Sequence, residues 1–111
     1  MAQTLLQAIT IRVDNPDRAA AFYIALGIPF TKNTDGSEGY AVKQGDILLE
    51  IQAGLAQGAR LRFQVPNLET AVSNVGRAGG RLDGRPETTS AGKKAVLLDP
   101  AGNRVELVEV A

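Results

Sequence analysis

The chain has 111 residues, with 12 acidic and 12 basic residues and neither histidine nor cysteine. This length fits one compact domain, and the missing cysteines exclude disulfides, thiolate metal sites and cysteine nucleophiles. Because the charges balance and are scattered, they argue against a nucleic-acid partner and favour a small molecule or a protein. The sequence contains no secretion signal and no apolar run near the roughly 20 residues that span a membrane, so we expect a cytoplasmic protein without a membrane partner.

The absence of histidine restricts the chemistry further. Histidine is the usual general base near neutral pH and the commonest metal ligand. Any reaction would therefore depend on carboxylates, arginines, lysines, tyrosines or hydroxyl groups.

The first half of the chain begins with an alternating pattern. Apolar Ile9, Ile11 and Val13 are separated by other residues, which predicts a strand with one buried face. Asn15 before a proline is typical of a helix N-cap, and Gly27 is typical of a helix end. We therefore expect a strand that includes Ile9, Ile11 and Val13, followed by a helix between Asn15 and Gly27. Tyr23 would be a core residue of this helix rather than a catalytic one.

The second half repeats this plan. Leu61, Phe63 and Val65 alternate, Asn67 provides an N-cap, and Gly79 ends the helix. Equivalent residues of the two halves are 52 positions apart in the sequence. This spacing holds for the last valine of each strand, for the asparagine at the start of each helix and for the glycine at its end. The chain therefore contains two halves that share one strand-helix plan.

Three further strands are expected in each half, at residues 28–32, 39–43 and 47–52, and at residues 81–85, 93–98 and 104–110. Each half then reads βαβββ. We predict an α+β fold for a single domain, residues 1–111, with a first module of about 1–53 and a second of about 58–111. The amphipathic helices would cover the outer face of a curved sheet, and the inner face would line a cleft.

Three segments resemble the vicinal-oxygen-chelate superfamily of glyoxalases, bleomycin-resistance proteins and dioxygenases. They are Asn-Pro-Asp-Arg-Ala-Ala-Ala-Phe-Tyr from residue 15, Leu-Gly-Ile-Pro-Phe from residue 26, and Asp-Pro-Ala-Gly-Asn-Arg-Val-Glu-Leu-Val-Glu from residue 99. The resemblance covers nearly the whole chain. It implies the paired-module fold and homodimers with two equivalent clefts. Each cleft is built by modules of one chain or by modules from two chains, and the sequence leaves both arrangements open.

In metal-dependent members of that superfamily, each module supplies one ligand from its first strand and one from its last. The resemblance places these ligands at Ala8 and Arg60, and at Glu50 and Glu106. An alanine has no ligand atom, and a guanidinium cannot be deprotonated to bind a divalent ion. We therefore expect no metal and no cofactor.

The strand period indicates which polar residues face the cleft. If the apolar set faces the helices, the intervening residues face the opposite side. We expect Arg60 to be held by Glu106 or Glu50 and to present hydrogen-bond donors to an anionic or carbonyl-bearing ligand. Alternatively, the pair only fills a vestigial metal site. The other candidate ligand-binding residues are Thr10, Arg12, Arg62, Leu48 and Tyr40. Tyr40 either forms part of the cleft wall or is an ordinary residue of the sheet.

Lys93 and Lys94 are interpreted as a solvated turn, or alternatively as a clamp on a ligand. The leading function is a metal-independent protein that binds a small molecule. One alternative is a lyase or isomerase that uses Glu50 or Glu106 as its general base. The other is an accessory protein with a vestigial cleft.

Overall fold

The computed structural model describes residues 5–55, 59–90 and 92–110, and these form an α+β fold of two helices and nine strands. The first half contains β1 (Ala8–Val13), α1 (Pro16–Leu26), β2 (Thr31–Lys32), β3 (Tyr40–Gln44) and β4 (Ile47–Ala53). The second half contains β5 (Arg60–Gln64), α2 (Leu68–Arg77), β6 (Arg81–Leu82), β7 (Glu87–Thr89), β8 (Gly92–Leu98) and β9 (Arg104–Val110).

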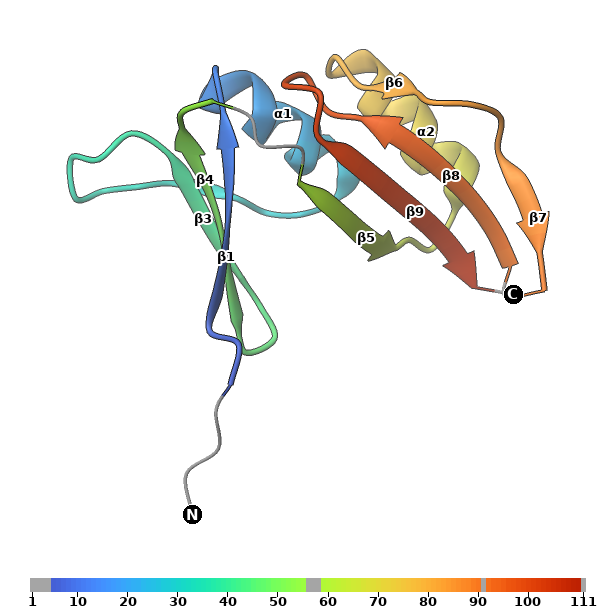
Figure 1. Ribbon diagram of the computed structural model, residues 1–111, viewed down its shortest axis with the longest axis horizontal. Helices are drawn as coiled ribbons and strands as arrows, with labels where there is room; N and C mark the ends of the chain where they lie inside the picture. Colours follow the sequence, from blue (N-terminus) through green and yellow to red (C-terminus); the bar gives the residue numbers. More distant parts are fainter. Residues whose placement is uncertain (1–4, 56–58, 91, 111) are drawn as a thin grey trace.

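The strands form two separate sheets, one from each half (Figure 1). The first sheet has the order β1-β4-β3-β2, and the second has the order β5-β9-β8-β6, with β7 also paired to β8. In both sheets the first strand runs parallel to the last strand of its module, and the remaining pairs are antiparallel. The chain thus builds the same strand arrangement twice.

Both helices begin at the asparagines that the sequence indicated. The side chain of Asn15 accepts a hydrogen bond from the amide of Arg18 at 3.1 Å, and that of Asn67 accepts one from Thr70 at 2.9 Å. Helix α1 ends at Gly27, whose φ of 108° is in the left-handed region that glycine adopts without strain. In the described part of the chain, no helix is long and apolar enough to cross a membrane.

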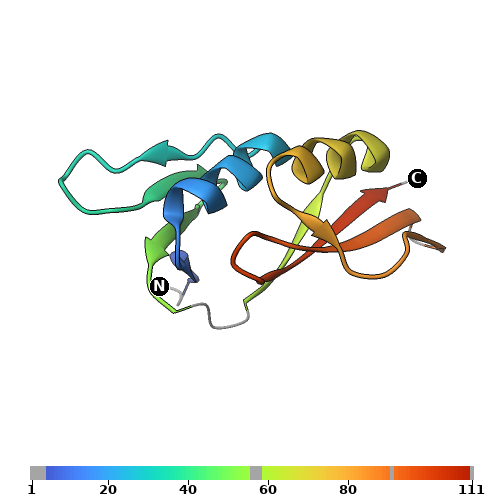
Figure 2. The same cartoon turned by 90° about the horizontal axis from the view of Figure 1, so that it is seen from above.

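The helices lie side by side on one side of the molecule, and the two sheets spread away from them (Figure 2). Tyr23 of α1 connects the two halves of the core. Its ring centroid lies 5.8 Å from that of Phe30 in the first half and 6.3 Å from that of Phe63 in the second. Because the tyrosine is fully buried, its packing fixes how one module sits against the other.

The predicted α+β class and paired βαβββ modules are confirmed, with three differences in detail. The strands after each helix are shorter than expected, because β2 and β6 each pair over only two residues. The segment between the strands expected at residues 81–85 and 93–98 contains a further strand, β7, which pairs with β8. Among the described strands, the two modules also keep separate sheets rather than sharing one curved sheet.

Candidate functional site

Each sheet turns one face to a helix, and the opposite face, called the concave face below, carries polar side chains beside apolar ones such as Leu48 and Val108. In the first sheet Thr10 of β1 lies opposite Glu50 of β4, and its hydroxyl donates a hydrogen bond to the carboxylate at 3.3 Å. In the second sheet Arg62 of β5 lies opposite Glu106 of β9. The parallel strand pairs therefore place one carboxylate at an equivalent position on each sheet.

Glu106 holds two cations on the second sheet. One carboxylate oxygen lies 3.1 Å from Nε of Arg62, and the other lies 3.0 Å from Nζ of Lys94. These three residues are called the Glu106 cluster below. The carboxylate is mostly covered, with 16% of the side chain exposed, whereas 68% of the Arg62 side chain is exposed. The cluster thus presents cationic groups outward around a partly covered anion.

The electrostatics of the cluster favour the ionised carboxylate. The hydrogen bond from Lys94 lowers the pKa of Glu106 below its usual range, with a further contribution from Arg62 that partial burial opposes. Glu106 therefore stays negatively charged at neutral pH, where it neutralises only one of the two cations. The cluster keeps a net charge of about +1, which favours an anionic or electron-rich ligand group.

A hollow of about 500 Å³ lies beside this cluster. Arg62, Lys94 and Gln64 provide polar lining, and Val108 and Val110 provide apolar walls. Pockets for small organic molecules commonly have volumes of roughly 300–1,000 Å³ and combine apolar walls with a few polar groups. The hollow has the size and chemical character of such a pocket, and its lining comes from the second sheet alone.

The ion pair expected at Arg60 is instead formed by Arg62. In the parallel register of β5 and β9, Arg60 lies opposite Arg104, whose guanidinium contacts Asp83 at 3.1 Å. The Glu106 carboxylate is two residues farther along β9 and meets Arg62. Arg60 does not line the hollow beside the cluster.

The remaining candidates are divided between the two faces of the first sheet. Glu50, Arg12 and Leu48 share the concave face with Thr10, because directly paired residues point to the same side. Tyr40 lies on the helix side, where its hydroxyl donates a hydrogen bond to Asp17 of α1 at 2.7 Å. The structure therefore brings Thr10, Arg12, Leu48 and Glu50 together on one face, and separates them from Arg62 and Glu106 on the other sheet.

Lys94 is the member of the cluster that sequence reasoning missed. The two consecutive lysines stand at the start of the strand expected at residues 93–98 and were interpreted as a solvated turn or a ligand clamp. They lie on β8, so their side chains point to opposite faces. Lys94 reaches Glu106 on the concave face, and Lys93 is directed to the helix side. The alternation of residues 93–98 predicted a strand, but only a strand that already starts at Gly92 includes both lysines and directs Lys94 to the concave face.

The residues at the implied metal-ligand positions do not fit a divalent ion. Both oxygens of Glu106 already contact cations, which repel a second positive ion. Within the described ranges, no group of three or more histidine, cysteine, aspartate or glutamate residues is arranged to hold a metal. The donor set therefore matches the recognition of an anion better than the coordination of a metal.

The chain is similar to known proteins over nearly its full length. The model of the glyoxalase-like domain family matches residues 8–108. None of the curated proteins matches the chain in sequence.

Similar solved structures include hypothetical protein SA1046 from S. aureus, with 18% identity, a TM-score of 0.78 and 98% of each chain covered. A glyoxalase/bleomycin resistance protein from Albidiferax ferrireducens T118 has 18% identity and a TM-score of 0.76, and the match covers 97% of this chain and 100% of that one. TnmS3, an antibiotic binding protein from Streptomyces sp. CB03234, has 23% identity and a TM-score of 0.75, with coverage of 100% and 99%. At these identities the structural likeness shows a shared fold.

The extent of the family match and the paired βαβββ modules lead to one assignment. The chain belongs to the glyoxalase-like domain family, within the vicinal-oxygen-chelate superfamily.

Proposed function

We propose that this protein binds a small organic molecule with an anionic or carbonyl group, without a metal, at the Glu106 cluster. The observation that carries the proposal is the position of Arg62 and Lys94, two cations fixed by one carboxylate at the lining of a hollow of about 500 Å³. The similarity to TnmS3, an antibiotic binding protein, supports ligand binding as the general class of function.

The geometry of Arg62 suits it to contact a ligand. Glu106 is held through Nε of the guanidinium, so this contact does not use the two terminal nitrogens. A guanidinium that is anchored at one edge loses less conformational freedom when its remaining donors bind a carboxylate or carbonyl. Val108 and Val110 would contact the apolar part of the same ligand.

Two chains would complete each binding site in this proposal. Thr10 and Glu50 lie on one concave face and the Glu106 cluster on another, so a homodimer could pair the first module of one chain with the second module of its partner. Among the described strands, β1 and β5 each pair on one side only, which leaves both with an edge for a partner. Exposed apolar side chains lie just before β1 and just after β4, at Leu5, Leu6 and Leu55.

Sedimentation at micromolar concentration tests this assembly. A mass of two chains, reduced to one by Leu5→Ser combined with Leu6→Ser, is the expected result. A mass of one chain for the unmodified protein would contradict the dimer. We also propose that residues 1–111 form one domain, which limited proteolysis tests. Cell fractionation tests the proposed cytoplasmic location.

An enzyme of the lyase or isomerase type is the alternative that the site supports less well. Glu106 as a general base would need a pKa near the working pH, but hydrogen bonding lowers its pKa instead. Glu106→Gln separates the two functions. Loss of turnover with retained ligand affinity would support catalysis, whereas loss of affinity without any turnover in the unmodified protein would support binding. An accessory protein with a vestigial cleft would show neither activity.

The first experiment is a thermal-shift screen with divalent metals and a panel of small aromatic, carboxylate and drug-like compounds. A ligand that binds only the folded state raises the melting temperature. We expect stabilisation by an organic anion, its loss in Arg62→Ala, and its retention in Arg81→Ala, which removes an exposed arginine on β6. Stabilisation by metals alone, or no response to any compound, would contradict the proposal.

A further inference from the structure

A second hollow lies on the opposite side of the second sheet, and the internal repeat allows a comparison with the same place in the first module. Strand register defines equivalent positions in the two modules. Thr10 pairs with Glu50 and Arg62 pairs with Glu106, so these pairs are equivalent. Ala41 is paired to Glu50 in the same way as Val96 is paired to Glu106. One residue earlier on the same strands, Tyr40 therefore corresponds to Ala95.

In the first module, a tyrosine closes the space between the helix and the sheet. Tyr40 on β3 extends to α1 and donates its hydrogen bond to Asp17 in the first turn of the helix. The space that remains has a volume of about 240 Å³ and is lined by polar and charged residues, among them Lys32 and Glu38. Packing and charge leave little room for an apolar molecule there.

The equivalent space in the second module is larger and apolar. Ala95 replaces the tyrosine, and Leu68 and Val72 of α2 stand where the first module has Pro16 and Ala20. The resulting hollow has a volume of about 400 Å³ between α2 and the strands β7 and β8. It is called the α2 hollow below. Ala95 is buried in the core and does not line the hollow, so the two modules differ here mainly in the side chains between helix and strands, which are apolar in the second module.

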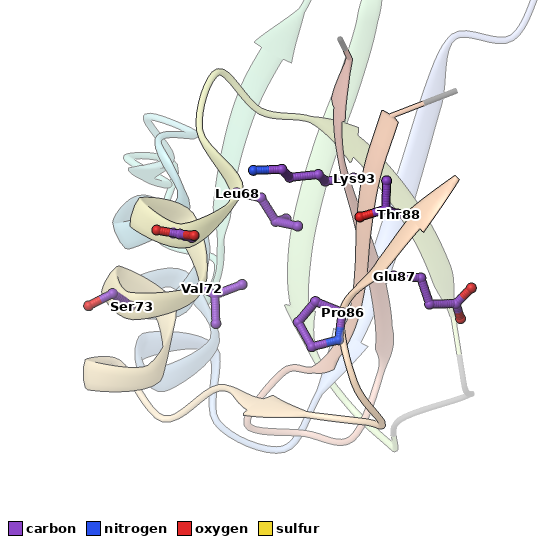
Figure 3. Close-up of a pocket in the computed structure, with 8 residues that line it drawn as sticks. Leu68, Val72, Ser73, Pro86, Glu87, Thr88 and Lys93 are labelled. Carbon is purple, nitrogen blue, oxygen red and sulfur yellow. The ribbon is translucent and has the colours of Figure 1, made fainter. Parts of the chain in front are cut away.

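The residues that line the α2 hollow divide into an apolar floor and a charged rim. Leu68 and Val72 project from the helix, and Pro86 faces them from the opposite wall (Figure 3). The Lys93 side chain extends from β8 toward the start of α2, whereas the Glu87 side chain points away from the hollow (Figure 3). Among the described residues, no ion pair involves Lys93. One cation is therefore available beside an apolar surface.

We propose that the α2 hollow is a second binding site, for a monoanionic apolar carboxylate whose charged group contacts Lys93. The apolar part of the ligand would cover Leu68, Val72 and Pro86, and thereby remove their exposed surface from water. The site lies on the opposite face of the sheet from the Glu106 cluster, because Lys93 and Lys94 alternate along β8. The two sites are therefore independent.

The surrounding charges disfavour a doubly charged ligand, because Glu69 and Glu87 line the hollow together with Lys93. Glu69 in the first turn of α2 also lines the hollow, and a dianion such as phosphate would be repelled by its carboxylate. The start of the helix is already capped, since Glu109 accepts a hydrogen bond from the Leu68 amide at 2.6 Å and Asn67 accepts one from Thr70. Lys93 is consequently the partner that this hollow offers to a carboxylate.

Titration of the full chain with octanoate, followed by backbone amide NMR, tests the proposal. We expect saturable shifts at residues 68–73 and 87–88, no such shifts with inorganic phosphate, and weaker binding of octanol. Lys93→Gln should weaken octanoate binding about tenfold, because it removes a charge-assisted hydrogen bond. The matched variant Lys43→Gln, which changes an exposed lysine on β3 of the other sheet, should leave these shifts unchanged.

Thr88→Trp provides a second test, because Thr88 is exposed and lines the hollow, so that a large ring at this position would occupy part of it. It should abolish octanoate binding at the α2 hollow. If this variant does not fold, Lys93→Gln alone decides the result. The proposal is overturned if octanoate gives no saturable shifts around α2, or if Lys43→Gln weakens its binding as much as Lys93→Gln.

Discussion

Tyr23 on α1 donates a buried hydrogen bond to Asp99, 76 residues later in the chain, with 2.8 Å between the two oxygens. Asp99 begins the turn between β8 and β9, and it also accepts hydrogen bonds from the amides of Ala101 and Asn103. Burial raises the pKa of the Tyr23 hydroxyl strongly, with additional effects of the Asp99 charge and the hydrogen bond. The helix of one module is thereby joined to a turn of the other.

Tyr23→Phe should lower the free energy of unfolding by about 2 kcal/mol, because it removes a buried hydrogen bond to a charged acceptor. Chemical denaturation measures this change. Tyr40→Phe is the matched control, because its hydrogen bond to Asp17 is exposed and its loss should cost no more than about 0.5 kcal/mol. Equal effects of the two substitutions would contradict a special role for the buried pair.

Two glycines near the end of α2 should respond in opposite directions to alanine. A Cβ on Gly80 would lie well inside the van der Waals contact distance of the buried Phe22 ring and 3.0 Å from the carbonyl oxygen of Val75. Gly80→Ala should therefore destabilise the protein by about 1–3 kcal/mol. A Cβ on Gly76 meets no atom within 4 Å, so Gly76→Ala should stabilise the helix by about 0.5–1 kcal/mol. Thermal unfolding of both variants measures the contrast, and a stabilised Gly80→Ala would show that Phe22 can move aside.

The lowered pKa of Glu106 predicts a pH dependence of stability. A carboxylate with a lower pKa in the folded state contributes its stability above the unfolded value of about 4.3 and loses it as the pH falls through the folded value. Unfolding measured from neutral pH down to about pH 3 should show this loss in the unmodified protein and not in Glu106→Gln. Because the cluster is partly exposed, the difference should not exceed about 1 kcal/mol. Glu38→Gln, outside the cluster, should keep the dependence of the unmodified protein.

Local patterns in the sequence predicted the elements of the fold. Alternation around Ile11 and Phe63 identified the first strand of each module, and Asn15 and Asn67 identified the helix starts. These predictions succeeded because side-chain periodicity and end capping depend on residues within one or two turns of each other. The family resemblance then joined these elements into paired modules.

Tertiary structure decided which of these residues meet. The alternation of residues in the sequence predicted that Arg60 and Arg62 lie on the same face. Only the register of β5 against β9 shows that Arg62 is the arginine that lies opposite Glu106 and forms the ion pair. That register is set by packing and by connections more than 40 residues long, so near-neighbour patterns do not contain it. The α2 hollow has the same origin, since Leu68, Thr88 and Lys93 line it together only because α2, β7 and β8 pack against one another. The sequence by itself determined the faces of the strands, and the pairing of the strands determined the sites.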